Sequence, residues 1–273
     1  MAISLLNETG VVVVAVTCDN PSCNWKMMEN LGANLSNADH LKVTLRLNNV
    51  IHVPILVIFD VGHLLKLVRN CVGDFKSFFS GSGHPINWNY IVALHEIQSK
   101  NGLHAANRLR SKHIDYKSNK MKTSYAAQTF SKSVASGVRY CNHQKYPEFE
   151  GSEETAHFVN LLNDMFDQLN QKSKYGKHLK APLCEKNFHV WSSNFVDYTN
   201  YIKTLKHSNG KAVICKSITI ITLELIQKLN IVRIISSYQN KLVFTQWLLL
   251  SSCSGKSESR IYWIFSCYEK LQV

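Results

Sequence analysis

The sequence has no apolar stretch long enough to cross a membrane. Its β-branched run at residues 11–16 covers six residues, whereas a transmembrane helix needs roughly 20. Residues 1–10 have neither a basic start nor an apolar centre, so they do not resemble a secretory signal peptide. These absences predict an intracellular protein without a membrane segment. The 273 residues allow one large domain or two small ones, each with a buried core.

Two common kinds of motif are also missing. None of the eight cysteines forms a Cys-x-x-Cys pair, and their spacing gives no zinc-knuckle or disulfide framework. Reduced thiols of an intracellular protein are therefore expected. The sequence contains no Gly-x-x-x-x-Gly-Lys-Ser/Thr phosphate loop, which excludes the commonest kind of nucleotide site.

Acidic residues are scarce relative to basic ones. The net charge is +12 and the isoelectric point is about 9.3, a balance that favours polyanionic partners such as nucleic acid or nucleotides. Residues 99–145 contain ten Lys and Arg and a single acid, whereas residues 146–170 contain six acids and no Lys or Arg. This pattern is compatible with local charge complementarity and with DNA binding, and both interpretations remain open.

The first sixty residues are typical of an α/β unit. Residues 11–16 predict a buried strand that delivers Asp19, residues 24–31 predict a short helix stopped by Gly32, and residues 55–59 predict a second strand that ends before Asp60. We therefore expect Asp19 and Asp60 at the carboxyl ends of adjacent strands, where α/β proteins usually place their sites.

From His63 onward the apolar residues recur at helical spacing. Ser152 is predicted to cap a helix whose first turn carries Glu153 and Glu154. The last stretch, 230–273, is rich in Ser, aromatic and β-branched residues and has no clear period; its part 251–259 is expected to be a loop. The predicted fold class is α+β and dominantly α-helical, with helices over residues 63–71, 87–99, 120–138, 152–169, 192–205 and 217–229.

Asp19 is a weak signal when its pattern is considered alone. A carboxylate at a strand end can bind a divalent cation, but an Asp in that position is more often a turn or helix-capping residue. A two-metal nuclease needs several converging carboxylates to balance two Mg²⁺ ions.

Longer motifs carry more weight than any single residue. Together they resemble the P-element-type DNA transposases and the related THAP-domain transposase-derived proteins. The resemblance rests on Cys-Asp-x-x-x-x-Asn-x-Lys-Met-x-x-x-Leu-Gly at 18–32 and on Phe-Asp-Val-Gly-His-Leu-Leu-Lys-Leu-Val-Arg-Asn at 59–70, where Gly62 replaces the usual Pro. It is extended by the stretches at 102–109, 120–131 and 158–170.

The resemblance implies a partial RNase H-like core at residues 1–62, a large all-α GTP-binding insertion domain at 63–229 and a divergent tail at 230–273. It makes Asp19 a remnant of a catalytic triad and a Mg²⁺ ligand. It also implies GTP contacts by Arg108, Lys122, Asp167 and Asn170. Alternatively, Asp167 and Asn170 have no ligand and only form the polar face of an amphipathic helix.

The resemblance also implies partners and a location. These are DNA as the ancestral partner, GTP, another copy of the chain or a related transposase, and the nucleus.

Three parts of the family pattern have no counterpart in the sequence: the first catalytic Asp, the final Glu, and the zinc-coordinating DNA-binding domain. We therefore expect a catalytically inactive fragment that keeps GTP binding in its helical domain. One alternative is a domesticated protein that binds nucleic acid or a transposase partner without nucleotide. A second alternative is a degenerate product without a stable function.

Overall fold

The computed structural model forms two compact units, which are described separately. The first comprises Met1–Asp60, Leu183–Ser192 and Leu223–Val273, and the second comprises Val61–Pro182 and Ser193–Thr222. The structure describes residues 3, 5, 8, 12–18, 22–34, 42, 44–45, 55–102, 106, 108–170, 175–181, 185–211 and 261–266.

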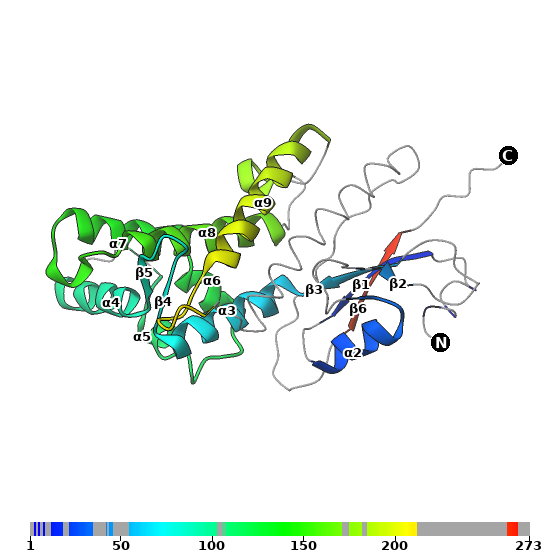
Figure 1. The fold of residues 1–273 in the computed structure, drawn as a ribbon, viewed down its shortest axis with the longest axis horizontal. Helices are drawn as coiled ribbons and strands as arrows, with labels where there is room; N and C mark the ends of the chain where they lie inside the picture. The colour runs from blue at the N-terminus through cyan, green and yellow to red at the C-terminus, as the bar shows by residue number, and fades with distance from the viewer. Residues whose placement is uncertain are drawn as a thin grey trace. The chain divides into compact units, whose positions relative to one another are not determined.

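The first unit contains a four-stranded sheet in the order β2-β3-β1-β6 (Figure 1). Strand β1 (Val12–Cys18) is parallel to β3 (Ile55–Phe59), and Cys18 lies opposite Phe59. Helix α2 (Ser22–Asn30) follows β1, and β2 (Thr44–Leu45) lies antiparallel to β3. Both predicted strands and their adjacency are thus confirmed. Asp19 itself lies outside the described residues.

Strand β6 (Ile261–Ser266) was not predicted. It pairs antiparallel with the other edge of β1, and the register shifts between Val13 and Ala15. Its sequence, Ile-Tyr-Trp-Ile-Phe-Ser, consists mostly of β-branched and aromatic residues that favour strands. The sequence did not predict this strand, because its apolar residues do not alternate with polar ones and a strand without a polar face carries no period-2 signal. The loop expected at 251–259 lies outside the described residues.

The second unit is mostly helical, as expected from the spacing. Its order is α3 (Val61–Phe75), β4 (Ser77–Phe79), β5 (Pro85–Asn87), α4 (Asn89–Asn101), α5 (Ser111–Ile114), α6 (Thr123–Thr129), α7 (Lys132–His143), the 3-10 turn η1 (Pro147–Phe149), α8 (Glu153–Leu169) and the 3-10 turn η2 (His178–Lys180). The 3-10 turn η3 (Glu185–Asn187) leads into α9 (Phe188–Thr204), whose C-terminal part belongs to this unit. The dominantly helical α+β class is confirmed. The helix expected at 217–229 lies outside the described residues.

Three features of this unit differ from the sequence-based expectation. The antiparallel pair β4–β5 is an unpredicted hairpin, whose turn places Gly83 at a φ of +82°. The single helix expected over 120–138 is two helices, because the chain turns at buried Phe130, and the Ser131 hydroxyl donates to the Gln128 carbonyl at the end of α6. The third difference lies at the start of α8.

Ser152 occupies the predicted N-cap of α8 but its side chain does not cap the helix. Its hydroxyl is buried and has no hydrogen-bond partner within the described part of the chain. Glu153 and Glu154 lie in the first turn of α8, as predicted, and each also binds a side chain. Glu153 forms an ion pair with Arg139, whose Nε lies 2.7 Å from its carboxylate. Glu154 accepts a hydrogen bond from the Tyr201 hydroxyl at 2.6 Å.

Aromatic rings form the centre of the helical unit. The Phe158 ring of α8 meets Phe78 of β4 edge-on at 5.3 Å between centroids, and Phe130 edge-on at 6.3 Å. Helices α7 and α8 pack side by side, and α3 packs against α6 and α8 (Figure 1). Phe158 therefore joins the hairpin, the end of α6 and α8 in one core. Within the described residues, no helix is both long enough and apolar enough to span a bilayer.

Candidate functional site

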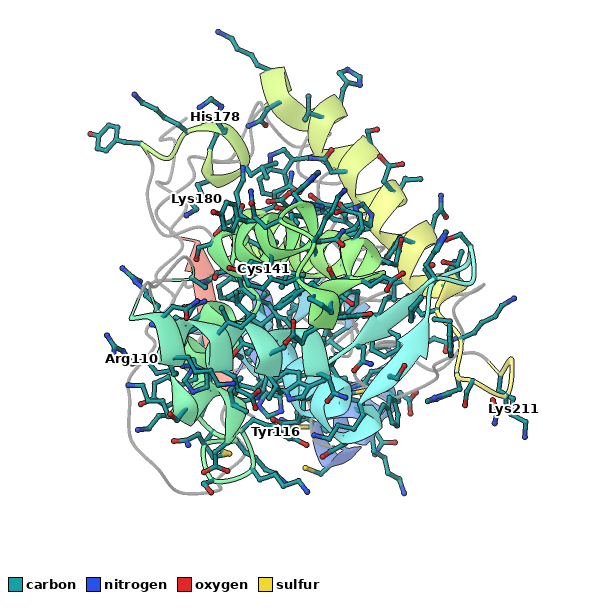
Figure 2. The ribbon with its side chains drawn as sticks, turned by 90° about the vertical axis from the view of Figure 1, so that its left-hand side faces the viewer. Arg110, Tyr116, Cys141, His178, Lys180 and Lys211 are labelled. Carbon is teal, nitrogen blue, oxygen red and sulfur yellow. The ribbon has the colours of Figure 1, made fainter. Side chains whose placement is uncertain are left out.

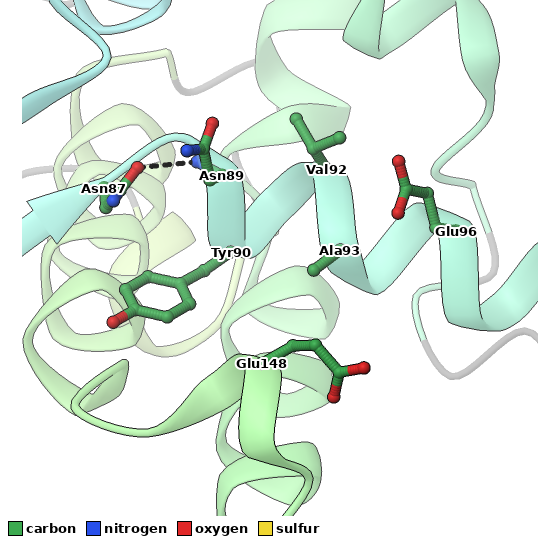
Figure 3. Close-up of a pocket in the computed structure, with 7 residues that line it drawn as sticks. All are labelled: Asn87, Asn89, Tyr90, Val92, Ala93, Glu96 and Glu148. Atoms are coloured by element: carbon green, nitrogen blue, oxygen red, sulfur yellow. Dashed lines mark hydrogen bonds between the residues drawn. The ribbon is translucent and has the colours of Figure 1, made fainter.

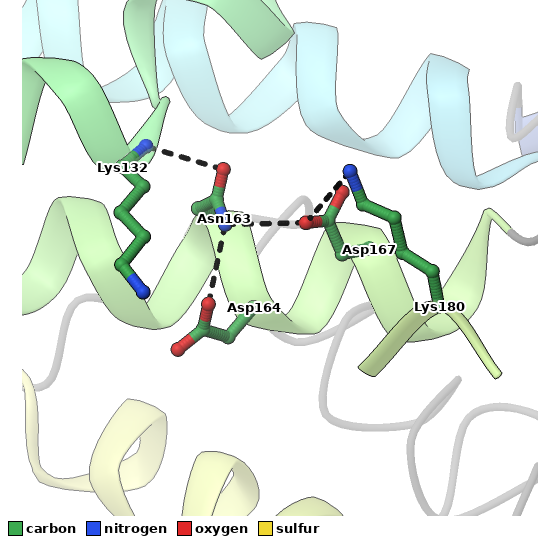
Figure 4. Close-up of polar contacts among 5 residues, drawn as sticks. All are labelled: Lys132, Asn163, Asp164, Asp167 and Lys180. Atoms are coloured by element: carbon green, nitrogen blue, oxygen red, sulfur yellow. Dashed lines mark hydrogen bonds and ion pairs between the residues drawn. The ribbon is translucent and has the colours of Figure 1, made fainter. Parts of the chain in front are cut away.

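A row of amide and carboxylate side chains runs along α8 (Figure 4). The Asn163 amide nitrogen lies 3.2 Å from a carboxylate oxygen of Asp164 and 3.4 Å from Oδ2 of Asp167. Asn160 donates to the other oxygen of Asp164 at 3.0 Å. The Asn163 carbonyl accepts a hydrogen bond from the backbone nitrogen of Lys132, the first residue of α7. Asn163 thus orients both carboxylates and ties them to the neighbouring helix.

Asp167 has a second partner that comes from outside the helix. Lys180, at the end of η2, places its Nζ 3.4 Å from Oδ2 of Asp167. The Lys180 side chain is 65% exposed and that of Asp167 is 25% exposed, so this pair contributes about 0–1 kcal/mol to stability. Both contacts of Asp167 are made by Oδ2. Its Oδ1 accepts no hydrogen bond from any side chain that the structure describes.

The residues around Asp167 are polar as well. Asn170 is half-buried at the C-cap of α8, where its backbone nitrogen donates to the Phe166 carbonyl at 2.9 Å. Gln168 is buried, and neither its amide nitrogen nor its carbonyl oxygen has a hydrogen-bond partner in the described structure. A buried amide without hydrogen-bond partners lowers the stability of the folded state, and most buried polar groups do have partners. The end of α8 is therefore unusual in its hydrogen bonding.

The two predicted basic residues lie elsewhere in the helical unit. Arg108 is exposed in a turn before α5, and Lys122 is the exposed N-cap of α6. The Nζ of Lys122 lies 3.4 Å from the Tyr125 hydroxyl, and the Nζ of Lys112 lies 4.6 Å from the centre of the Tyr125 ring. Among the residues that the structure describes, no polar contact joins Arg108 or Lys122 to Asp167 or Asn170.

The lysines around Tyr125 change its acidity. The pKa of Tyr125 is lowered, first by its interaction with Lys112 and then by Lys122, because two nearby cations favour the phenolate. The helical unit therefore has two distinct polar regions: an acidic and amide-rich row on α8, and a cationic group around Tyr125.

A shallow depression of about 400 Å³ lies beside α4 and does not include any predicted residue (Figure 3). Glu96 and Glu148 contribute carboxylates to its wall, and the Tyr90 hydroxyl donates to the Glu150 carbonyl at 2.7 Å. These carboxylates repel phosphate groups, so the depression is a poor site for a nucleotide.

At the predicted catalytic edge of the sheet, the structure describes one carboxylate. Asp60 follows β3, and its backbone nitrogen donates to the Cys18 carbonyl at 3.0 Å, which extends the β1–β3 pairing. In the part of the chain that the structure describes, no three His, Cys, Asp or Glu side chains gather as metal ligands do. The catalytic role of Asp19 therefore stays a prediction.

The sequence did not indicate three of these residues. Asn163 and Lys180 surround Asp167, and Lys112 joins Lys122 at Tyr125. Asn163 lies four residues before Asp167 on the same helix, so the i, i+4 spacing was a usable signal. Lys180 follows a stretch without helical periodicity, and no pattern pointed to it.

The comparisons with known proteins agree on one lineage. Residues 62–182 match the model of the family "TNP-like, GTP-binding insertion domain". The chain is 30% identical to the DNA transposase THAP9 of Homo sapiens over 216 residues, which is 78% of this chain and 23% of that protein. It is 33% identical to the transposable element P transposase of Drosophila melanogaster over 175 residues, which is 61% of this chain and 21% of that protein.

One solved structure shares the fold. The Drosophila P element transposase strand transfer complex matches with a TM-score of 0.73 and 24% identity, over 86% of this chain and 51% of that chain. The chain thus spans less than a quarter of the length of the two curated relatives and about half of the solved one. The motifs, the family model and the shared fold lead to one conclusion: the chain is a P-element-type transposase-derived protein.

Proposed function

We propose that the helical unit binds a guanine nucleotide at the C-terminal end of α8 and that Asp167 contacts the base. The observation that carries this proposal is the match of residues 62–182 to a GTP-binding insertion domain. The geometry of Asp167 supports it. Asn163 and Lys180 hold one carboxylate oxygen, and no described side chain occupies the other.

The chemistry of guanine fits a carboxylate. Its Watson–Crick edge presents two neighbouring N–H donors, and an ionised Asp accepts two hydrogen bonds. Adenine presents an acceptor in place of one of these donors, so a site built on Asp167 favours GTP over ATP. The Asn170 amide can add a polar contact to the nucleotide, and Arg108 and Lys122 are proposed to neutralise its phosphates.

Asp167→Ala should lower the affinity for GTP by about ten-fold or more, because losing a charged hydrogen-bond partner costs roughly 1.5–3 kcal/mol. Isothermal titration calorimetry with GTP and with ATP measures this loss and the preference between the two nucleotides. The matched control is Asp164→Ala, which removes a carboxylate on the same helix that is held by the same Asn163.

The control variant should bind GTP as the unchanged protein does. Equal affinities for ATP and GTP, or equal losses in the two variants, would contradict a base-reading role of Asp167. Circular dichroism establishes that both variants keep their helices.

We also propose that a polypeptide of these 273 residues does not cut or join DNA. Asp19 is the one residue of the expected catalytic triad that its sequence matches, and a single carboxylate cannot balance two Mg²⁺ ions. Incubation with labelled DNA and Mg²⁺ or Mn²⁺ should give no cleavage or strand transfer. Cleavage that disappears in Asp19→Ala would overturn this proposal.

The origin of the chain suggests where it acts and on what. We propose a nuclear protein whose ancestral partner is DNA and which associates with another copy of itself or with a related transposase. The family relationship supports these partners, together with the net charge of +12.

A further inference from the structure

Six of the fifteen residues at 108–122 are basic and one is acidic. We call residues 108–122 the basic segment; it links α4 to α6 through the short helix α5. Its six cations are all exposed: Arg108, Arg110, Lys112, Lys117, Lys120 and Lys122. Such a density of one charge creates a positive potential that attracts polyanions.

A buried arginine beneath the basic segment holds its backbone in place. Arg69 of α3 is 0% exposed. One of its terminal nitrogens, Nη2, donates to the carbonyl of Asn119 at 3.1 Å and to that of Lys120 at 3.0 Å, and its Nε donates to Asn70 at 2.9 Å. A fork of two hydrogen bonds to neighbouring carbonyls fixes the chain just before Lys122.

Tyr116 fixes the middle of the basic segment. Its hydroxyl donates to Asp74 of α3 at 2.7 Å, and its ring meets Trp88 edge-on at 5.4 Å between centroids (Tyr116 is labelled in Figure 2). The ring packs so closely on α3 that a Cβ added at Gly73 would lie 2.5 Å from it. The contacts of Tyr116 and Arg69 therefore hold the segment against a helix at two points.

The start of the basic segment is also fixed. The Arg110 backbone nitrogen donates to Nδ1 of buried His113 at 2.9 Å, and Nε2 of His113 lies 2.7 Å from the side-chain oxygen of Gln128 of α6. The cations are thus carried by a backbone with a defined shape instead of a free loop.

The placement of Arg69 is unfavourable for stability alone. Its Nη1 is buried without a hydrogen-bond partner, and no carboxylate forms an ion pair with it among the described residues, since Asp74 binds Tyr116 instead. Desolvation by burial lowers the pKa of Arg69, which reflects the cost of a charge held away from water. A polyanion bound to the segment offsets part of this cost.

An exposed apolar side chain lies among these cations. Met121 is 68% exposed between Lys120 and Lys122. Simple phosphate ions are bound by charge and hydrogen bonds, whereas nucleic-acid surfaces combine cations with apolar side chains that contact bases or sugars. The chemistry of the segment therefore fits a strand of nucleic acid better than a single phosphate.

We propose that the basic segment is a preorganised surface for the phosphate backbone of nucleic acid, held in its binding shape by Arg69 and Tyr116. Its action does not require bound GTP. Arg108 and Lys122 belong to both proposals. The test therefore leaves these two residues unchanged.

The test replaces three lysines of the segment that belong to this proposal alone. The triple variant Lys112→Gln, Lys117→Gln, Lys120→Gln is compared with a control that removes the same charge from exposed lysines of the same unit: Lys100→Gln, Lys203→Gln, Lys211→Gln. Fluorescence anisotropy measures the binding of a labelled 20-nucleotide single strand and of the same sequence as a duplex, over a range of salt concentrations.

The segment variant should bind both nucleic acids at least about ten-fold more weakly, and the slope of log affinity against log salt should decrease by about two to three, one for each lost phosphate contact. The control should lose much less. Equal losses of nucleic-acid affinity in the two variants would mean that net charge alone causes the effect, which would overturn the proposal. Unchanged affinity of the segment variant would also overturn it. The loss of nucleic-acid binding should be the same with and without added GTP, so this outcome is independent of whether Asp167 reads guanine.

The role of Arg69 is tested by Arg69→Lys, which keeps the charge but lacks the planar guanidinium whose Nη2 and Nε donate in fixed directions. Nucleic-acid affinity should fall about three- to ten-fold through lost preorganisation, with unchanged helical content. Should this variant not fold, Tyr116→Phe, which removes the hydroxyl that binds Asp74, is measured in the same way. A folded variant of either kind that binds nucleic acid at full strength would overturn the positioning role.

Discussion

Phe158→Ala is expected to lower the free energy of unfolding of the helical unit by about 3–5 kcal/mol, the usual cost of removing a buried phenyl ring. Phe158 is buried and meets two other rings edge-on, Phe78 of β4 and Phe130 at the end of α6. Its removal leaves a cavity where three elements join, and it also removes two favourable aromatic contacts.

Thermal unfolding followed by far-UV circular dichroism measures this change, which corresponds to a decrease in Tm on the order of 10 °C. The matched control is Tyr140→Ala, because Tyr140 lies in the same unit and is 58% exposed. The control should change Tm by little. A Tm shift for Phe158→Ala no larger than that of the control would mean that this ring is not at the centre of the core.

Alkaline pH is expected to destabilise the helical unit, and Tyr201 should account for part of the effect. Burial raises the pKa of Tyr201, and so does the hydrogen bond that its hydroxyl donates to Glu154 at 2.6 Å. Burial also raises the pKa of Tyr198, with help from Asp164 and Asp197, and burial and the bond to Asp74 raise that of Tyr116 to about 12.

The sign follows from the direction of these shifts. An unfolded tyrosine loses its proton near pH 10, whereas Tyr201 keeps it when folded. The stabilisation is complete below about pH 10 and is lost as pH rises toward the folded pKa, by about 1.4 kcal/mol per pH unit for one such tyrosine. The unfolding free energy should therefore decrease less between pH 9 and pH 11 in Tyr201→Phe than in the unchanged protein.

Urea denaturation at each pH gives these free energies. Tyr140→Phe serves as the control, since it removes the hydroxyl of a tyrosine that is 58% exposed, and the pH dependence of this variant should match that of the unchanged protein. Parallel pH profiles for Tyr201→Phe and the unchanged protein would show that Tyr201 does not keep its proton in the folded state.

The sequence predicted the elements that have a regular pattern. The β-branched runs predicted β1 and β3, and the helical spacing predicted most of the second unit. Strand β6 and the β4–β5 hairpin were missed because the hairpin strands have three residues each and β6 has no alternation. Periodicity needs more residues than these elements offer, and strand pairing at a distance leaves no local signal.

The candidate site was predicted only in part, for a related reason. Helical spacing placed Asp167 on α8, but Lys180 reaches it from a 3-10 turn that carries no pattern. The role of Arg69 was missed because an arginine is ordinarily expected at the surface, and only the structure shows its guanidinium beneath the Asn119 and Lys120 carbonyls. Patterns therefore indicated which elements carry the polar residues, and tertiary contacts determine their partners.

The pairing of β6 with β1 has a consequence for the order of folding. Cys18 lies beside Phe59 on one edge and beside Ile261 on the other. Closing a chain loop costs entropy that grows with its length, by about 0.6 kcal/mol for each doubling. The β1–β3 pair therefore has the smaller entropic barrier and forms early. The chain segment between β1 and β6 contains the whole helical unit. If that unit folds first, the effective loop that must close to pair β6 with β1 becomes shorter. Nascent chains should thus complete this sheet late, after the helices have formed.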